Sequence, residues 1–466
     1  MQAVNFTLAF CGFGPASSGL LFSLAKSGDI AKVGRQGIMI VERSKIIGSG
    51  KLSKYKMQSN TLSDVILECV CDNLLPEEMT ELRQQSQAVS QLEVLRGQAP
   101  DLSLVSNCLM DASEMLVSSL SKHHHILLQR EHFVEALTVR DDGTFDVEVR
   151  APTGNLITSR VASVVLNLGG IQTSESRASL GSVFHCTLPK SMPIIPSDSV
   201  LRKSDAGLLA QFSPLLGKRR TLVVAGSSHS AFSVVERLAK ISDRAGFTRI
   251  ILYYRSEPRF YYHDLTTAEL FGEHIDASRD VCPLSGKVNR LGGLRFRTAE
   301  VAREVFKTKR LEKYPVEIEF KTAVNRSGEA VLADELRDVA AIVTCYGYRP
   351  LLPILRDQTG DVLKLAEDDH GLTTDEFGRP LTQDNNVIRG LFSFGLGSGM
   401  RVGSEVGGEP SYKRRLDGIW LYHNHVGKKV VTGMIHDLQQ LEIMSRASCR
   451  SWAAGDDPPS LKVSEL

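Results

Sequence analysis

The stretch LAFCGFGPASSGLLFSL (residues 8–24) constrains the fold more than any other part of the sequence. An apolar run that fits a short buried strand (residues 6–11) leads into two glycines and a proline. Leu20, Leu21 and Leu24 then follow at helical spacing. A strand, a glycine turn and a helix in this order form the first unit of a dinucleotide-binding fold.

In such a unit each residue of the turn has its own task. Gly12 allows the tight turn, and Gly14, which has no Cβ, lets a diphosphate approach the helix N-terminus, where free N–H groups favour an anion. Ser17 stands at the third glycine position, where a small side chain suffices. The strand GIMIVER (37–43) ends in Glu42, the acid expected on the ribose hydroxyls, although it comes 30 residues after Gly12 rather than about 20. We therefore predict nucleotide phosphates between Gly12 and Gly14.

A second strand–turn–helix unit begins at TLVVAGSSHSAFSVVERLAK (221–240). Its turn has Ser228 where the second glycine belongs, so a Cβ would crowd a diphosphate. Either the nucleotide lies slightly further out or the site has become purely structural. After the next strand come Arg255 and Ser256, a cation and a hydroxyl where a 2′-phosphate would be bound. Arg255 could instead be a solvated strand end.

Strands that alternate with helices predict an α/β protein with two Rossmann-like dinucleotide-binding domains and parallel sheets. Helices are expected over 61–71 and 415–437, and strands over 121–170. The predicted domains are a discontinuous first domain with a helical insert, a second domain between its two parts, and a disordered tail. Their boundaries are 1–200 (insert near 74–122), 201–365, 366–452 and 453–466.

Composition excludes several classes of protein. With a net charge of +1 and 23% charged residues, nothing indicates a nucleic acid or membrane partner. The eight cysteines include no Cys-x-x-Cys, so we expect packing residues rather than disulfides, and we expect no signal peptide and a cytoplasmic protein. His123, His124 and His125 are consecutive and cannot converge on one ion from a strand, so no metal site is predicted.

The motifs resemble those of the two-dinucleotide-binding flavoproteins, and among them the ornithine and lysine N-hydroxylases and the flavin-containing monooxygenases. GFGPASSGL (12–20) resembles their FAD fingerprint, including Pro15 after the second glycine. VVAGSSHSA (223–231) resembles their NADPH-binding turn. KMQSNTLSD (56–64), TCYGYRP (344–350) and LFSFGLGSG (391–399) resemble further family motifs that lie near the flavin or close over it.

The resemblance implies FAD and NADPH as cofactors and assigns roles to residues of these motifs. Gln58 and Asn60 would lie beside the flavin C4a, with Lys56 in the same catalytic segment, although Gln58 and Asn60 could equally cap the next helix. His263 and Asp264 would accept the substrate's proton or contact its charged groups, or else satisfy backbone in a loop. The remaining implied cofactor contacts are Met57, Gly226, Ser227, Ser228, Ser230, Ala231, Tyr346, Gly347, Tyr348, Gly395 and Gly397.

The implied activity is that of an FAD- and NADPH-dependent monooxygenase. Such an enzyme uses molecular oxygen and a C4a-hydroperoxyflavin to N-hydroxylate an amine of a small amino acid or polyamine. The alternative is a flavin-dependent oxidoreductase or oxidase of the same fold with a vestigial NADPH site, which Ser228 favours. Neither the substrate nor the oligomeric state follows from the sequence.

Overall fold

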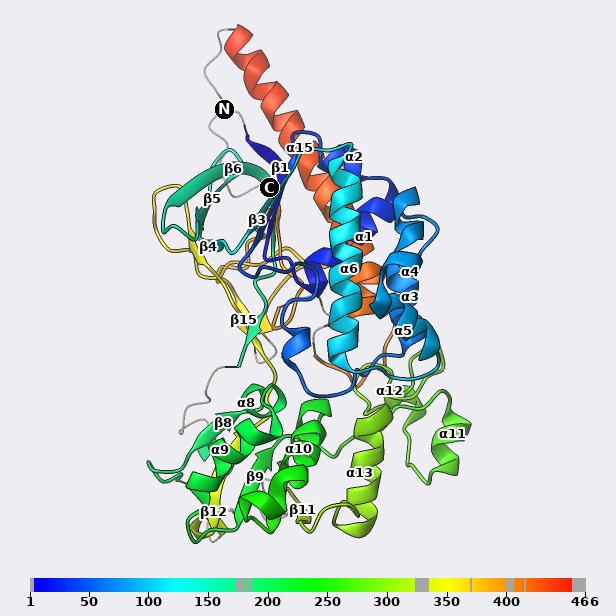
Figure 1. Cartoon of the computed structure of the whole chain (residues 1–466). Helices are drawn as coiled ribbons and strands as arrows, with labels where there is room; N and C mark the ends of the chain where they lie inside the picture. Colours follow the sequence, from blue (N-terminus) through cyan, green and yellow to red (C-terminus); the bar gives the residue numbers. More distant parts are fainter. Residues whose placement is uncertain are drawn as a thin grey trace.

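The computed structural model describes residues 4–172, 180–181, 184, 187–322, 335–368, 371–398, 400, 406–414 and 416–454. Figure 1 shows two lobes, each built on its own sheet. The predicted disordered tail lies outside the described residues from 455 onward. No helix in the described ranges has the length and apolar character needed to cross a membrane.

The first lobe has a sheet with strand order β14-β4-β5-β6-β1-β2-β3, and β17 also pairs with β6. Strands β6, β1, β2 and β3 are parallel to one another, whereas β4 and β5 form an antiparallel extension. The bounds are β1 Phe6–Cys11, β2 Ile38–Glu42, β3 Ile126–Arg130, β4 Phe133–Val139, β5 Phe145–Arg150, β6 Leu156–Leu166, β14 Ile354–Arg356 and β17 Leu391–Phe392. The apolar runs of β1 and β2 are buried along their whole length, as expected for central parallel strands.

The second lobe has a parallel sheet with strand order β11-β10-β9-β12-β8. Its strands are β8 Ile194–Pro196, β9 Thr221–Ala225, β10 Arg249–Tyr254, β11 Glu317–Thr322 and β12 Val339–Thr344. The chain therefore enters this sheet at β8 and is back in the first sheet at β14. The predicted boundary after residue 200 falls 6 residues after the start of β8, and the one after residue 365 falls 11 residues after the start of β14. Strands β7 (Gly170–Ile171) and β13 (Arg349–Pro350) pair where the chain leaves and re-enters the first lobe.

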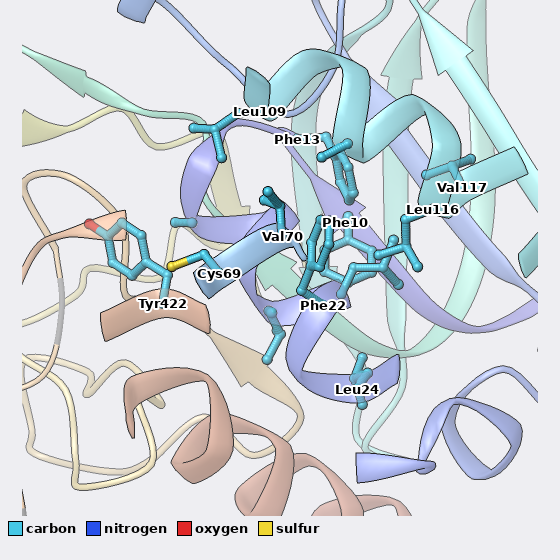
Figure 2. Packing of buried hydrophobic residues seen from close by; sticks show 14 of the residues in the cluster. Phe10, Phe13, Phe22, Leu24, Cys69, Val70, Leu109, Leu116, Val117 and Tyr422 are labelled. Carbon is cyan, nitrogen blue, oxygen red and sulfur yellow. The ribbon is translucent and has the colours of Figure 1, made fainter. Parts of the chain in front are cut away.

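Helices of the first lobe gather on one face of its sheet (Figure 1). They are α1 Pro15–Ser27, α2 Ile30–Val33, α3 Ser63–Val70, α4 Leu82–Gln85, α5 Gln87–Val94, α6 Leu102–Ser121, α14 Ile419–His423 and α15 His425–Ala454. Figure 2 shows Phe10, Phe13 and Phe22 packed with side chains of α3, α6 and α14 in one cluster. The insert predicted at 74–122 is therefore helical and contributes to this core. The helix predicted over 415–437 is two helices that meet at Asn424.

Helices of the second lobe are α8 Asp198–Leu201, α9 Asp205–Leu216, α10 His229–Ala245, α11 Leu265–Leu270, α12 Ala277–Asp280 and α13 Phe296–Thr308. In Figure 1, α11 and α12 lie beside α13, and α12 is close to the helices of the first lobe. The segment 257–296, which we call the bridging segment, bonds to the first lobe. The backbone amide of Ser411 donates to the carbonyl of Arg279 (2.8 Å), and Arg290 Nη1 donates to the carbonyl of Val406 (2.8 Å).

Candidate functional site

The turn between β1 and α1 has the geometry of a close backbone approach. Gly12 has a φ of +84°, and a Cβ at this position would lie 2.8 Å from the carbonyl carbon of Asn167 at the end of β6. Gly14 is the N-cap of α1, Pro15 begins the helix, and no side chain caps it. Ser17 is buried, and its Oγ donates to the carbonyl of Gly12 (2.6 Å). The first N–H groups of α1 are therefore left for a ligand.

A second glycine loop lies against this turn. A Cβ at Gly14 would lie 3.6 Å from the Cα of Gly50, so the two backbones pack closely against each other at the N-terminus of α1. Between Gly48 and Gly50 stands Ser49, which is fully buried and whose Oγ has no hydrogen-bond partner among the described residues. An unpaired buried hydroxyl is costly unless a ligand satisfies it. We call Gly12, Gly14, Ser49 and Gly50 the cradle.

Glu42 closes one end of the cradle. Its carboxylate is buried and accepts hydrogen bonds from the backbone amides of Phe13 (2.8 Å) and Ser44 (2.9 Å). The carboxylate therefore lies beside the turn after β1, where a ribose would be. The prediction that it binds ribose hydroxyls remains a prediction.

Asn167 ties the other end of the cradle to the late glycine motif. Its Oδ1 accepts from the amides of Phe394 (3.2 Å) and Gly395 (3.1 Å), and its Nδ2 donates to Ser17 Oγ (3.4 Å). Gly397, with a φ of +84°, packs so closely on β13 that a Cβ would lie 2.6 Å from the nitrogen of Pro350. The residues of the first and last predicted cofactor motifs thus meet at one end of the sheet.

The segment predicted to lie beside the flavin runs between the lobes. The backbone amide of Lys56 donates to the carbonyl of Leu201 in the second lobe (2.8 Å), and Met57 packs against the core of that lobe. The side chains of Lys56, Gln58 and Asn60 are exposed. Helix α3 begins after Leu62 without a side-chain cap, so the structure does not support the capping alternative.

The turn between β9 and α10 repeats the first turn with differences. Gly226 has a φ of +134°, and a Cβ there would lie 3.0 Å from the carbonyl oxygen of Cys345. Ser227 Oγ donates to the carbonyl of Ser256 (2.9 Å), which joins the turn to the end of β10. Ser228 is the N-cap of α10 but makes no side-chain capping bond. Ser230 lies in the first turn of α10, and Ala231 is fully buried against the sheet.

Arg255 and Ser256 follow β10 and are exposed. Arg255 has no ion-pair partner within the part of the chain that the structure describes. Its guanidinium is therefore free to pair with an anion next to the second turn.

Tyr348 belongs to a partly buried polar cluster that sequence reasoning did not predict as a unit. Its hydroxyl donates to Asp198 Oδ1 (2.6 Å) and lies 2.7 Å from the hydroxyl of Tyr55, which also contacts Asp198 (2.8 Å). Arg202 donates to the Tyr55 hydroxyl (2.6 Å) and pairs with Asp198. Burial raises the pKa of Tyr348 and of Tyr55. These groups join the two lobes beside the predicted cofactor residues Tyr346 and Gly347.

Asp264 has a structural role at the start of α11. It is the N-cap of α11 and accepts a hydrogen bond from the amide of Thr267 (2.7 Å), which lowers the pKa of its carboxyl. A carboxylate with a lowered pKa is a weak proton acceptor, so the loop-capping alternative is the one that the geometry supports. His263 is exposed, with Nδ1 3.3 Å from the hydroxyl of Tyr261.

The cysteines and histidines of the described residues form neither disulfides nor a metal site. Cys11, Cys69, Cys71, Cys108, Cys282 and Cys345 are free thiols. In the described ranges no three His, Cys, Asp or Glu side chains gather as a metal site would need. His125 stacks on Phe6 with ring centroids 5.5 Å apart, which gives one member of the histidine triplet a packing role.

No family model matches the sequence. The chain is 27% identical over 448 residues to CMP-5′-(3-aminopropyl)phosphonate hydroxylase of Streptomyces rubellomurinus, a match that covers 92% of this chain and 98% of that protein.

Solved structures of similar fold include an ornithine N-hydroxylase of Kutzneria sp. 744 with reduced FAD, NADP+ and L-ornithine. Its TM-score is 0.53 at 13% identity, and the match covers 92% of this chain and 99% of that one. An FAD-bound cadaverine monooxygenase of Erwinia amylovora has a TM-score of 0.53 at 14% identity, and the match covers 94% of this chain and 95% of that one. The reduced ornithine hydroxylase of Pseudomonas aeruginosa has a TM-score of 0.54 at 12% identity, and the match covers 93% of this chain and 100% of that one. The predicted resemblance is therefore confirmed: this chain has the fold of the flavoprotein N-hydroxylases and is similar in sequence, over nearly its whole length, to a hydroxylase.

Proposed function

We propose that this protein is an FAD- and NADPH-dependent monooxygenase that hydroxylates the nitrogen of a primary amine in a small molecule. The observation that carries the proposal is the cradle. Gly14 and Gly50 face each other at the uncapped N-terminus of α1, and the buried Ser49 hydroxyl beside them is unpaired. A diphosphate beside this contact would accept hydrogen bonds from the free N–H groups of α1 and from the Ser49 hydroxyl.

The residues present fit both cofactors. The cradle and Glu42 would hold FAD, and the Gly226–Ala231 turn with Arg255 would hold NADPH. When bound and reduced, FAD supplies the activated oxygen for transfer to the amine. The protein's own task is to orient the amine, exclude water and remove a proton.

The amine of the substrate must lose a proton before its nitrogen can react. An alkylamine has a pKa near 10.4, so freeing its lone pair at pH 7 costs about 3 pKa units, or roughly 4 kcal/mol. The site must therefore desolvate the ammonium group or offer a proton acceptor. His263 remains the predicted acceptor, because Asp264 is engaged at the N-terminus of α11.

The sequence match narrows the range of candidate substrates. The relative from Streptomyces rubellomurinus is named for CMP-5′-(3-aminopropyl)phosphonate, in which an aminopropyl phosphonate is linked to CMP. We propose that the substrate here is likewise an amine that carries a phosphonate or phosphate, rather than a free amino acid or polyamine.

Substitution of Gly14 by Ala tests the proposal directly. A Cβ at Gly14 would meet Gly50 Cα at 3.6 Å, an ordinary contact, and the residue has a negative φ of −89°, so the variant should fold. In a dinucleotide-binding turn a Cβ at the second glycine crowds the diphosphate at the helix N-terminus, so FAD affinity should fall at least tenfold. Flavin absorbance and a dissociation constant for FAD measure this.

Gly207→Ala is the matched control, because its Cβ would also make ordinary contacts, the nearest at 3.4 Å to Lys203, in a helix far from the cradle. Control and wild type should bind FAD equally. Normal FAD binding by a folded Gly14→Ala protein would contradict the assignment of the cradle.

The alternative function, an oxidase with a vestigial second site, is favoured by Ser228 at the N-cap of α10. NADPH oxidation that depends on the amine and yields hydroxylamine supports the monooxygenase. Oxidation of the amine without NADPH supports the oxidase.

A further inference from the structure

The polar cluster around Asp198 lies at the crossing between the two lobes. Helix α8, which contains Asp198, is at the end of the second lobe that faces the first lobe (Figure 1). The Oδ1 atom of Asp198 accepts hydrogen bonds from the hydroxyls of Tyr55 (2.8 Å) and Tyr348 (2.6 Å). Arg202 pairs with the other carboxylate oxygen, and the Asp198 side chain is only 14% exposed, so water competes little for these bonds. We call Tyr55, Asp198, Arg202 and Tyr348 the Asp198 cluster.

The charge of Asp198 holds the two tyrosine hydroxyls together. Their oxygens are 2.7 Å apart, so three short contacts between oxygens share two hydroxyl protons. One contact therefore lacks a proton, which is favourable only while a carboxylate attracts both hydroxyls. Arg202 also donates to the Tyr55 hydroxyl (2.6 Å), and its guanidinium lies 4.6 Å from the centroid of the Tyr55 ring. The position of Tyr55 against α8 thus depends on an ionised Asp198.

A short stretch of chain joins Tyr55 to the cradle. Gly50 of the cradle precedes Tyr55 by five residues, and the single helical turn Leu52–Lys54 lies between them. On the other side of Tyr55, the backbone amide of Lys56 donates to the carbonyl of Leu201 at the end of α8 (2.8 Å). The loop that carries one wall of the cradle is therefore fixed to the second lobe at Tyr55.

A similar stretch joins Tyr348 to the turn between β9 and α10. Cys345 precedes Tyr348 by three residues, and its amide donates to the carbonyl of Ala225 at the end of β9 (2.9 Å). The carbonyl oxygen of Cys345 would lie 3.0 Å from a Cβ at Gly226, so this segment packs directly against the second turn. Asp198 thus contacts one tyrosine close to each of the two nucleotide-binding turns.

The chain that leaves the first lobe is bonded at the same place. Gln172 directly follows β7, and its Oε1 accepts from the backbone amide of Asp198 (2.8 Å). Its Nε2 donates to Ser197 Oγ (2.7 Å), and the amide of Ser197 donates to the carbonyl of Thr344 at the end of β12 (2.9 Å). The outgoing connection, the returning connection and the loop after the cradle therefore meet at the start of α8.

We propose that Asp198 is a positioning residue for hydride transfer between the two cofactors. Through Tyr55 and Tyr348 it fixes the separation of the two nucleotide-binding turns, and so the approach of the two cofactor rings. In this step a hydride, with its electron pair, passes from NADPH, which is oxidised to NADP+, to FAD, which is reduced. The inference rests on the proposed function and adds a residue that lies outside both turns.

The test measures flavin reduction by saturating NADPH in the full-length holoenzyme, by rapid mixing without oxygen. Asp198→Asn keeps the shape of the side chain and removes its charge, whereas Tyr55→Phe and Tyr348→Phe each remove one hydroxyl. The limiting rate of flavin reduction should fall about tenfold or more in Asp198→Asn, because small misplacements of reacting groups cost rate steeply. Affinities for FAD and NADP+ should change little. The variant reduced with dithionite should react with oxygen at the wild-type rate.

Asp205→Asn is the matched control. Asp205 pairs with Arg237 (2.7 Å) and Lys240 (2.8 Å), and all three residues belong to α9 and α10 of the second lobe. This control removes an ion pair of similar length that joins no lobes, so the limiting rate of flavin reduction should stay at the wild-type value.

The shared carboxylate oxygen makes a second prediction about rates. Tyr55→Phe and Tyr348→Phe should each slow flavin reduction in the wild-type background. Neither should slow it further in Asp198→Asn, because both hydroxyls act through the same carboxylate. Independent, additive effects of the three substitutions would contradict the inference.

A readout without cofactors separates positioning from general stability. Small-angle X-ray scattering of the cofactor-free protein reports how the two lobes are arranged relative to each other. Asp198→Asn should broaden the distribution of interatomic distances, whereas Asp205→Asn should leave it as in the wild type. The same distribution in all three proteins would contradict a role of Asp198 in fixing the lobes.

The remaining outcomes are also distinct. Wild-type rates of flavin reduction in all three variants of the Asp198 cluster would overturn the inference. Loss of FAD or NADP+ affinity that accounts for the whole decrease in rate would overturn it too, because Asp198 would then only stabilise the fold. If Asp198→Asn does not fold, the two phenylalanine variants, which keep their rings, provide the answer. A wild-type protein that takes up no FAD would sink the proposed function, whereas a flavin-loaded protein with fully active variants would sink this inference alone.

Discussion

The turns after β1 and after β9 have the same local design and different surroundings. Both begin with a glycine at positive φ, +84° at Gly12 and +134° at Gly226, that packs against the end of a neighbouring strand. At the second small position, Gly14 faces Gly50 across the cradle, whereas Ser228 carries a Cβ and a hydroxyl that caps nothing. The same strand–turn–helix design thus occurs once with two glycines in the turn and once with a serine in place of the second glycine.

The largest effect is expected at the first turn. Gly12→Ala adds strain at positive φ, about 1 kcal/mol, and a Cβ 2.8 Å from the backbone of Asn167, about 2 kcal/mol more. We expect a loss of about 3 kcal/mol of unfolding free energy and no bound FAD. Denaturant unfolding and flavin absorbance measure both.

Gly28→Ala is the control, because Gly28 has a similar φ of +72° with nothing within 4 Å of a Cβ. The Gly28→Ala variant should lose about 1 kcal/mol of unfolding free energy and still bind FAD. Equal losses of unfolding free energy in the two variants would mean that the close packing of β6 on the turn adds nothing to the cost of Gly12→Ala.

These contacts explain what could be predicted from the sequence. The two strand–turn–helix units, the strands over 121–170 and the helical insert follow from local periodicity, which the sequence displays directly. Ser49 and Asn167 were missed because their importance depends on contacts with α1 that only the folded sheet creates. The helix predicted over 415–437 was wrong in one respect, because Asn424, with a φ of −126° and a ψ of −97°, breaks it.

Asp264 shows the same dependence on folded contacts. The sequence offered His263 and Asp264 as candidate proton acceptors, as contacts to the substrate's charged groups or as loop residues that satisfy backbone. The bond of Asp264 to the Thr267 amide, a common helix start, is a contact of the last kind.

Buried histidines extend the comparison of the two lobes. His423 lies in the core of the first lobe against Phe22, with ring centroids 4.8 Å apart, and burial lowers its pKa to about 3. The unfolded chain, with a pKa near 6.5, binds a proton that the folded protein refuses, so stability is lost as pH falls below about 6.5. Between pH 6.5 and pH 5 the loss is about 2 kcal/mol.

His423→Phe should flatten this part of the stability profile, measured as unfolding free energy against pH, whatever its absolute stability. His436→Gln, at a histidine whose side chain is 57% exposed, should leave the slope unchanged. A slope that persists in His423→Phe would assign the acid sensitivity elsewhere, with His229 of the second lobe as the next candidate.

Arg255 tests the coenzyme assignment of the second turn. Its exposed guanidinium is free to pair with a 2′-phosphate, an interaction worth about 2 kcal/mol. Arg255→Ala should therefore raise the dissociation constant of NADP+ by about 10- to 30-fold and leave that of NAD+ nearly unchanged. Titration with both coenzymes measures the ratio, and equal effects would remove the phosphate assignment.

The smallest effect is expected from exchanging the residues that distinguish the two turns. Ser228→Gly removes a Cβ that crowds a diphosphate and loses no capping bond, so NADP+ affinity should rise severalfold, equivalent to about 1 kcal/mol. The backbone at Ser228, with a φ of −101°, suits a serine as well as a glycine, so stability should change little. Calorimetric titration of NADP+ measures the gain. If affinity does not rise, the coenzyme lies further from α10 than FAD lies from α1.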